Sequence, residues 1–231
     1  MPKHTRIIEI KPGPLDAAKM GEIAGVLRKD GVMAYPTDTF YGLGAGAYSG
    51  TAVRKIYLLK KREQGKPLSV VISGVDMAEK VAALLPPAFS DLSRKFWPGP
   101  LTLVIKAKPL FPPAMLGPGG SLALRLPDVP WLLELVRRMD VPLTATSANI
   151  SGEKEIDSRE EVIEIFSGKV DLIIDGGKTP GGLPSTIVDL TSDKPRILRE
   201  GAVPSERLRP YLKRGQTYSL RNPPKRIVRS E

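Results

Sequence analysis

Two pairs of polar residues, each with one residue between its members, are the part of the sequence best suited to chemistry. Lys60 and Arg62 lie in LLKKREQGKPLSVVI, and Ser147 and Asn149 lie in TATSANIS. On a helix such a pair points to different faces, whereas in an extended segment both members point to one face. We therefore expect both pairs at the ends of helices or strands, where they would build one anion-binding site from two sides.

The basic pair is expected at a turn between a helix and a strand. A helical stripe of apolar residues runs from 53 to 60, Gly65 and Pro67 interrupt it, and residues 68–72 form an apolar run typical of a buried strand. The helix should therefore end near Lys60. We expect Lys60 and Arg62 at an exposed turn outside the core, so that their replacement removes activity and leaves the fold intact.

Composition excludes several classes of site. The chain of 231 residues is 41% hydrophobic, which suffices for a full core, and it has no cysteine and one histidine, His4. Disulfides, thiolate nucleophiles, cysteine zinc sites and sites built on several histidines are thereby excluded. The sequence shows neither an N-terminal signal nor an apolar run of roughly 18 residues, so we expect a cytoplasmic protein without a membrane partner.

The net charge of +10 is concentrated at the C-terminal end. Residues 207–231 contain eight basic side chains and one acidic one, a charge of +7, which leaves +3 for the preceding residues. We expect a domain over residues 1–206 and a basic, flexible tail over residues 207–231. The alternative for the tail is contact with nucleic acid or a partner.

The pattern of apolar residues predicts alternating strands and helices, followed by several consecutive strands. Predicted strands cover residues 6–10, 32–35, 68–72, 101–106, 122–126, 143–146, 170–174, 186–190 and 196–199; predicted helices cover residues 15–29, 77–85, 88–97, 131–139 and 158–166. Residues 109–120 form a proline- and glycine-rich excursion. This order indicates an α/β fold, a single domain with a twisted mixed β-sheet flanked by helices around a basic cavity.

The run Gly42-Leu43-Gly44-Ala45-Gly46-Ala47 matches a permissive dinucleotide-binding pattern. A polar insert separates it from the preceding strand, and the position about 20 residues on falls within the basic turn, so the Rossmann interpretation fails. We expect instead that these glycines allow close backbone packing under a cavity. No P-loop motif occurs in the sequence.

Eight segments, taken in order, resemble the YrdC-like family of threonylcarbamoyl-adenylate synthases: GVMAYPTDTFYGLGA, KKREQGKPL, FWPGPLTLVI, ALRLP, TSANISG, DLIIDGG, PSTIVDL and ILREG. The similarity covers about residues 15–203 and includes the K-x-R and S-x-N signature pairs of the family. Two departures are visible. Glu63-Gln64 stand where many relatives have a proline, and no second C-terminal domain of the longer relatives follows.

The resemblance implies synthesis of threonylcarbamoyl-AMP from L-threonine, bicarbonate and ATP with release of pyrophosphate. The product would pass to a tRNA threonylcarbamoyl transferase complex, and tRNA contact is conceivable. Such chemistry needs no cysteine or histidine, but it needs cations that neutralise a triphosphate. Mg²⁺ is expected to arrive with the nucleotide, because no dedicated carboxylate cluster is visible.

The resemblance also assigns roles to particular residues. Lys60 and Arg62 are the catalytic and phosphate-binding pair, and Lys66 assists them. The remaining assignments are Ser147, Asn149 and Arg199 for ATP, and Thr37, Arg125 and Ser185 for threonine, with no protein ligand for a metal. Taken singly, each of these residues would suit an ordinary helix end, cap or edge-strand position.

Two other functions stay open from the sequence. The first is an RNA-binding module that uses the basic cavity without catalysis, for which the intact signature pairs would be unnecessary. The second is carbamoyl-adenylate chemistry on another acceptor, as in hydrogenase maturation, which is disfavoured because the chain lacks the zinc-finger and acylphosphatase-like modules of those proteins.

Overall fold

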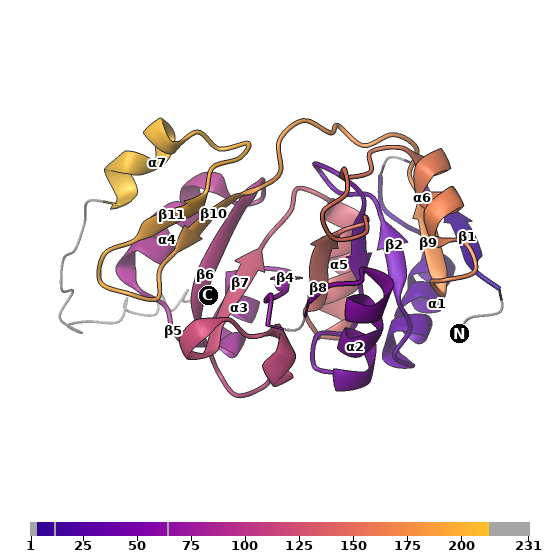
Figure 1. Cartoon of the computed structure of the whole chain (residues 1–231), viewed down its shortest axis with the longest axis horizontal. Helices are drawn as coiled ribbons and strands as arrows, with labels where there is room; N and C mark the ends of the chain where they lie inside the picture. The colour runs from indigo at the N-terminus through magenta and orange to yellow at the C-terminus, as the bar shows by residue number, and fades with distance from the viewer. Residues whose placement is uncertain (1–3, 12, 64, 213–231) are drawn as a thin grey trace, which may run out of the picture.

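The computed structural model describes residues 4–11, 13–63 and 65–212, and Figure 1 shows their arrangement. The strands are β1 (Arg6–Glu9), β2 (Met33–Tyr35), β3 (Gly42–Gly44), β4 (Ser69–Val71), β5 (Ala82–Leu84), β6 (Leu101–Ala107), β7 (Ser121–Arg125), β8 (Leu143–Ser147), β9 (Leu172–Asp175), β10 (Thr186–Asp189) and β11 (Arg196–Arg199). The helices are α1 (Ala17–Arg28), α2 (Gly50–Leu59), α3 (Val75–Val81), α4 (Pro87–Phe96), α5 (Pro130–Met139), α6 (Arg159–Phe166) and α7 (Ser205–Leu212), with 3₁₀ turns η1 (Pro113–Met115) and η2 (Pro118–Gly120).

The strands of the described residues form one sheet in the order β1-β9-β2-β3-β8-β4-β7-β6-β10-β11, with β5 paired to β6. Pairs β1–β9, β2–β9, β4–β7 and β6–β10 are parallel, and pairs β2–β3, β3–β8, β4–β8, β6–β7 and β10–β11 are antiparallel. The predicted α/β domain with a mixed sheet is confirmed.

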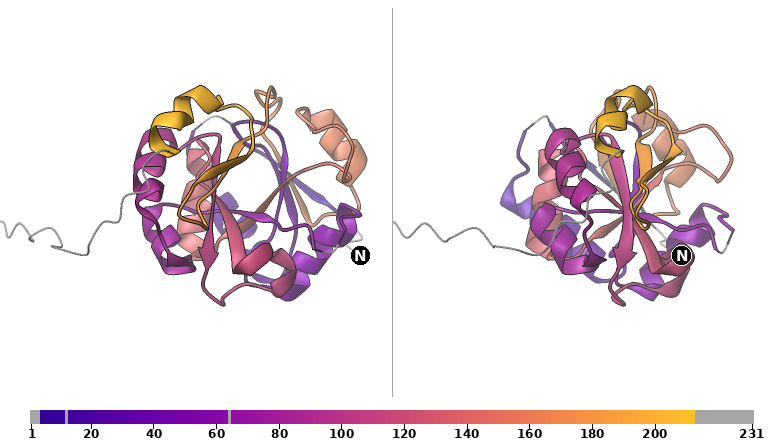
Figure 2. Two further views of the ribbon diagram at one scale, coloured as in Figure 1. Left: turned by 60° about the vertical axis from the view of Figure 1, so that its left-hand side comes forward. Right: turned by 90° about the vertical axis from the view of Figure 1, so that its left-hand side faces the viewer.

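Helices cover one face of the sheet. Helices α1, α3, α4 and α5 lie behind the strands in Figure 1 and to one side of them in Figure 2. The side chains of Val70, Leu103 and Leu124, in the three central strands β4, β6 and β7, are fully buried. Since successive residues of a strand point to opposite faces, the residues directly before and after these three in their strands face away from the helices. None of the described helices is long and apolar enough to cross a membrane.

Helix α2 ends where the sequence predicts. The Ser49 side chain caps it by accepting a hydrogen bond from the Ala52 amide at 3.1 Å. Lys60 is its C-cap residue, and Lys61 follows with φ of 48°, in the left-handed region that turns the chain away from the helix axis. Arg62 therefore leaves the helix in the turn toward β4, as expected.

Two elements differ from the prediction. Residues 82–84 do not continue the predicted helix but form β5, in which Ala82 pairs with Ala107. Residues 42–44, where the sequence predicts no strand, form the buried strand β3 between β2 and β8. A Cβ at Gly44 would lie 2.7 Å from Cε1 of Tyr35, so the expected close packing at these glycines is confirmed.

The folded domain extends past the boundary predicted at residue 206. Helix α7 spans Ser205–Leu212, and Leu208 is fully buried. Phe96 of α4 contacts α7 twice, edge to face with Tyr211 at 5.6 Å and beneath the Arg207 guanidinium. The sequence pattern does not predict this helix, because its few apolar residues share one face and are separated along the chain by basic residues. The predicted tail beyond residue 212 lies outside the described residues.

Replacement of Leu208 by alanine tests whether α7 belongs to the cooperative domain. We expect Leu208→Ala to lower the free energy of unfolding by about 2–4 kcal/mol, because it removes buried methyl groups and leaves a cavity. The control Arg209→Ala changes an exposed side chain and should stay within about 0.5 kcal/mol of the wild type. Urea unfolding measures both, and equal values for the two variants would contradict this boundary.

Candidate functional site

A cavity of about 460 Å³ lies on the face of the sheet opposite the helix layer. Its floor comes from alternate residues of neighbouring strands: Ser69 is in register with Ala123 of β7 and with Ala145 of β8, and Arg125 is in register with Val71 and Thr102. Because the floor residues Ser69, Ala123 and Ala145 are small, the sheet leaves room for a ligand above its centre.

Four cationic side chains line this cavity: Arg62, Lys66, Arg125 and Arg199. Glu155 is the carboxylate that lines it with them among the described residues. The basic cavity predicted from the sequence is present, and six of the predicted site residues line it directly: Thr37, Arg62, Arg125, Ser147, Ser185 and Arg199. Lys66, expected to assist, lines it as well, whereas Lys60 and Asn149 do not line it but hydrogen-bond to Ser147, which does.

Lys60 is buried, with 1% of its surface exposed, so the expected exposed position is wrong for this residue. Its Nζ donates to the carbonyl oxygens of Ser147 at 2.5 Å and Asn149 at 2.7 Å, and to Asn149 Oδ1 at 2.8 Å. The three N–H bonds of the ammonium thus have three acceptors. Sequence spacing predicts that the two pairs meet, but not that Lys60 binds the second pair itself.

Further bonds of the same network fix the loop after β8. Ser147 Oγ donates to Asn149 Oδ1 at 2.7 Å, and Asn149 Nδ2 donates to the Glu153 carbonyl at 2.5 Å. The Ser151 amide donates to the carbonyl of Lys60 at 2.9 Å. Both polar groups of the Asn149 side chain therefore have partners within the protein.

Burial, followed by the positive charge of Arg62, lowers the pKa of Lys60 from 10.5 to about 8, and Glu155 opposes this shift. Lys60 is therefore mostly charged at neutral pH. Arg62 itself lies in the exposed turn: its Nε donates to the Lys66 carbonyl at 3.1 Å and one terminal nitrogen to the Pro67 carbonyl at 2.9 Å. Lys66 pairs with Glu63 at 2.9 Å on the surface.

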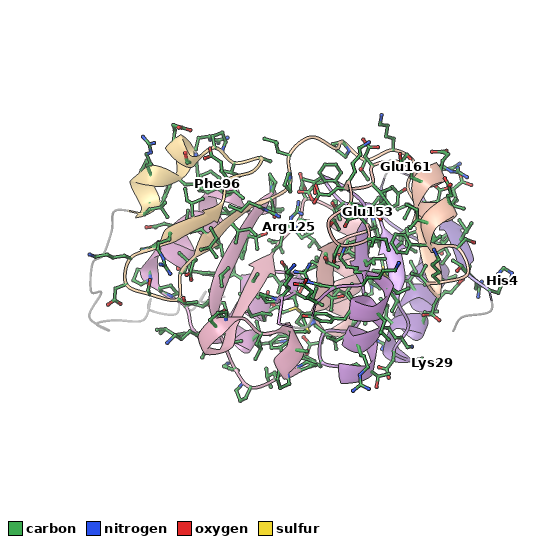
Figure 3. The ribbon with its side chains drawn as sticks, viewed as in Figure 1. His4, Lys29, Phe96, Arg125, Glu153 and Glu161 are labelled. Carbon is green, nitrogen blue, oxygen red and sulfur yellow. The ribbon has the colours of Figure 1, made fainter. Side chains whose placement is uncertain are left out.

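Arg125 forms an ion pair with Asp38 that is 2.6 Å long, and the side chains are 12% and 14% exposed. Its terminal nitrogens lie 3.4 Å from Thr39 Oγ1. The Nε of Arg125 is buried and has no hydrogen-bond partner among the described residues, while the side chain as a whole lines the cavity. Figure 3 labels Arg125 near the middle of the molecule, with Glu153 of the loop after β8 to its right.

The threonine-rich turn between β2 and β3 presents its own hydroxyls. Thr37 Oγ1 donates to the Phe40 carbonyl at 2.7 Å and accepts from the Thr39 amide at 3.1 Å. It also lies 3.1 Å from Thr39 Oγ1. These bonds hold the turn so that Thr37 and Thr39 both line the cavity.

Ser185, which directly precedes β10, and Arg199, the last residue of β11, line the cavity from the same end of the sheet. The Ser185 hydroxyl lies 2.9 Å from Thr102 Oγ1, and the Arg199 guanidinium donates to the Ser185 carbonyl at 2.8 Å. Burial lowers the pKa of Arg199, while Glu155 opposes and Arg125 adds to this shift. An anionic ligand would offset the repulsion between Arg199 and Arg125.

Three residues of this site are not predicted from the sequence. Asp38 orients Arg125, Thr102 binds Ser185, and Glu155 contributes a negative charge. Strand periodicity could have found Thr102, which is a hydroxyl within an otherwise apolar strand. Nothing in the sequence marks Glu155, because it lies in a loop.

No group of three histidine or carboxylate side chains suited to hold a metal ion occurs in the part of the chain that the structure describes. Asp38 is engaged with Arg125, which leaves Glu155 as the carboxylate in the cavity wall. One such group suits Mg²⁺ held chiefly by phosphate oxygens and water.

Sequence comparisons agree on one family. The Sua5/YciO/YrdC family model, described as telomere recombination, matches residues 25–201. The threonylcarbamoyl-AMP synthase of Pyrococcus abyssi is 40% identical over 185 residues, which are 80% of this chain and 54% of that protein. The synthase of Bacillus subtilis is 37% identical over 191 residues, 82% of this chain and 55% of that protein. The chain thus spans about half the length of these curated relatives.

Solved structures give the same result for the fold. P. abyssi Sua5 complexed with L-threonine superposes with a TM-score of 0.85 at 37% identity, covering 90% of this chain and 61% of that one. E. coli YciO superposes with a TM-score of 0.81 at 25% identity, covering 90% of this chain and 100% of that one. The YrdC-like fold predicted from the sequence is confirmed.

Replacement of Lys60 by methionine tests its structural bonds. We expect Lys60→Met to lower the free energy of unfolding by roughly 3 kcal/mol, because three buried acceptors lose a charged donor. The control Lys66→Met removes an exposed ammonium and should change the same quantity by less than about 1 kcal/mol. Urea unfolding at pH 7 measures the free energy of unfolding of both variants, and equal values would contradict a stabilising role for the Lys60 hydrogen bonds.

The lowered pKa of Lys60 also predicts a dependence on pH. Between about pH 8 and 10.5 the folded protein has lost the Lys60 proton while the unfolded chain retains it, so the unfolded state binds more protons and stability rises with pH. We expect the free energy of unfolding of the wild type, minus that of Lys60→Met, to increase over this interval. The subtraction removes other titrating groups, and a decrease would show that the pKa is raised.

Proposed function

The chain belongs to the Sua5/YciO/YrdC family, and we propose that it synthesises threonylcarbamoyl-AMP from L-threonine, bicarbonate and ATP. The observation that carries the proposal is the cavity with four cationic side chains beside the tied K-x-R and S-x-N pairs. Relatives named threonylcarbamoyl-AMP synthase and a relative solved with L-threonine support it. The chain would thus act as a nucleotidyltransferase.

The phosphates of ATP would bind at the exposed end of the cavity. Arg62 and Lys66 line this end, and their present partners are backbone carbonyls and an exposed carboxylate that phosphate oxygens can replace. Ser147 and Arg199 would contact other parts of the nucleotide. Lys60 has all three protons engaged, so we propose that it supports the nucleotide site chiefly by holding Ser147 and Asn149, and its direct contact with phosphate stays a prediction.

Threonine and bicarbonate would react at the Arg125 end. The threonine amine would attack bicarbonate, water would leave, and a carbamate would form with its negative charge near the Arg125 guanidinium, which lines the cavity. Thr37 and Ser185 supply hydroxyls that would position the amino acid. One carbamate oxygen then attacks the α-phosphorus, and the bond to the β-phosphate breaks with its electron pair on pyrophosphate.

The leaving pyrophosphate gains negative charge, which Arg62 and Lys66 would stabilise electrostatically. Mg²⁺, entering with the triphosphate, would supply further charge neutralisation of the phosphate oxygens. The product is an activated carbamate, suited to transfer of the threonylcarbamoyl group to adenosine in tRNA. We propose that a tRNA threonylcarbamoyl transferase complex accepts it.

Incubation of the protein with threonine, bicarbonate and ATP should release pyrophosphate and form threonylcarbamoyl-AMP in equal amounts. Omission of threonine or bicarbonate should abolish release, because the attacking oxygen belongs to the carbamate that the two form. Serine lacks one methyl group of threonine, which is worth roughly 1–3 kcal/mol, so serine should be a poorer substrate but still react. Coupled pyrophosphate detection and mass spectrometry measure these quantities.

Arg62→Ala tests the role of this side chain and should reduce pyrophosphate release on the order of 100-fold. Because Arg62 lies in an exposed turn, the melting temperature should stay unchanged. ADP as the product, or full release without either co-substrate, would overturn the proposed reaction. Binding of RNA without any pyrophosphate release would favour the RNA-binding alternative.

A further inference from the structure

We propose that Tyr57 is a positioning residue, whose hydroxyl holds the 62–67 turn in the place where Arg62 and Lys66 can bind phosphate. The inference rests on the proposed function in one respect, which is that ATP is the phosphate ligand of this turn. Tyr57 does not line the cavity, and it acts through the two cationic residues that do.

The hydroxyl of Tyr57 lies at a junction of three segments. The ring belongs to helix α2 and is 7% exposed. Its hydroxyl is 2.7 Å from the carbonyl oxygen of Lys66 and 2.5 Å from that of Ala114, and donates its proton to this pair of acceptors. The same Lys66 carbonyl accepts from Arg62 Nε at 3.1 Å, so Tyr57 and Arg62 share one acceptor.

The backbone completes a closed loop around this acceptor. The Arg62 amide donates to the carbonyl of Tyr57 at 2.9 Å. The turn is therefore anchored at its start by the Tyr57 carbonyl and at its end by the Tyr57 hydroxyl. Helix α2 is held in the core by the other buried residues of the same face, such as Ile56, which is fully buried. One residue thus transmits the position of a rigid helix to both ends of the turn.

The remaining contacts of the turn are weak supports. Glu63 and Lys66 pair across it at 2.9 Å, but their side chains are 76% and 57% exposed, so solvent screens the pair. Gly65 has φ of +92°, where glycine adds backbone freedom. The Tyr57 hydroxyl is the buried point of attachment. Burial raises the pKa of Tyr57, so the hydroxyl keeps its proton and stays a donor at neutral pH.

The second acceptor gives a role to the proline- and glycine-rich excursion at residues 109–120. Ala114 belongs to turn η1, and the neighbouring Met115 carbonyl accepts from the Leu68 amide at 3.2 Å. Pro118 and Ser121, which follow η1, line the cavity. Tyr57 therefore ties the excursion to the 62–67 turn, and the two segments form adjoining parts of the cavity rim.

Tyr57→Phe deletes the hydroxyl and keeps the buried ring. Calorimetric titration of the full chain with MgATP should show a dissociation constant roughly three- to tenfold higher than that of the wild type, which corresponds to one hydrogen bond. In the pyrophosphate assay, KM for ATP should rise more than kcat falls. The matched control Tyr48→Phe removes the hydroxyl of a tyrosine that is 38% exposed, keeps its ring against Phe111, and should leave both values unchanged.

A double-mutant cycle separates positioning from general destabilisation. If Tyr57 acts through Arg62, Tyr57→Phe should change ATP binding little in an Arg62→Ala background. Fully additive losses, or a Tyr57→Phe protein that binds ATP as Tyr48→Phe does, would overturn the inference. A change in melting temperature alone, with normal ATP binding, would likewise reduce Tyr57 to a structural residue.

Limited trypsin digestion gives a readout that needs no ATP. Trypsin can cleave after Lys61 and Arg62, and release of the turn should make cleavage there roughly three- to tenfold faster in Tyr57→Phe than in Tyr48→Phe. If the wild type binds ATP but releases no pyrophosphate, only the proposed function is refuted. ATP binding by the variants then still decides the role of Tyr57. If the wild type binds no ATP, the cleavage rates decide it, and equal rates reject it.

Discussion

The ammonium of Lys60 is the interaction on which the geometry of the site depends. It joins the end of helix α2 to the loop after β8 by three hydrogen bonds, and it is almost completely buried. A buried charge without acceptors is costly, so Lys60 can stay buried and charged only in conformations that keep the two segments within hydrogen-bonding distance. The ammonium therefore fixes the distance between the segment that carries Arg62 and the segment that carries Ser147.

The second constraint is the period of two along each strand. In β4, β6 and β7 one set of side chains is apolar and buried toward the helices, and the alternate set forms the cavity floor. A shift of one residue in the register of β7 would turn Arg125 into the apolar layer and Leu124 into the cavity. Thus the burial of the helix side of the sheet selects the position of the functional cation on the other side.

Much of this arrangement could be predicted from the sequence, because it depends on local patterns. The end of α2 near Lys60, the strand that follows it, and the charge of Arg125 within an apolar strand are all visible in residue order. Residues whose role comes from a distant partner could not be found in this way. Asp38 meets Arg125 across 87 positions, and β5 exists only because Ala82 pairs with Ala107. The burial of Lys60 likewise depends on acceptors 87 and 89 positions away.

The cations of the cavity are held by acceptors of graded strength, and this grading suggests how an anion would enter. Lys60 has three acceptors in the protein interior, and Arg125 forms a short ion pair with a carboxylate that is mostly buried. Arg62 donates to carbonyls of its own turn, and Lys66 has an exposed carboxylate that water screens. A phosphate group gains most where it replaces weak partners, since strong buried bonds cost more to exchange. Phosphate should therefore exchange with the partners of Arg62 and Lys66 first, while Lys60 and the Asp38–Arg125 pair keep the frame of the cavity in place.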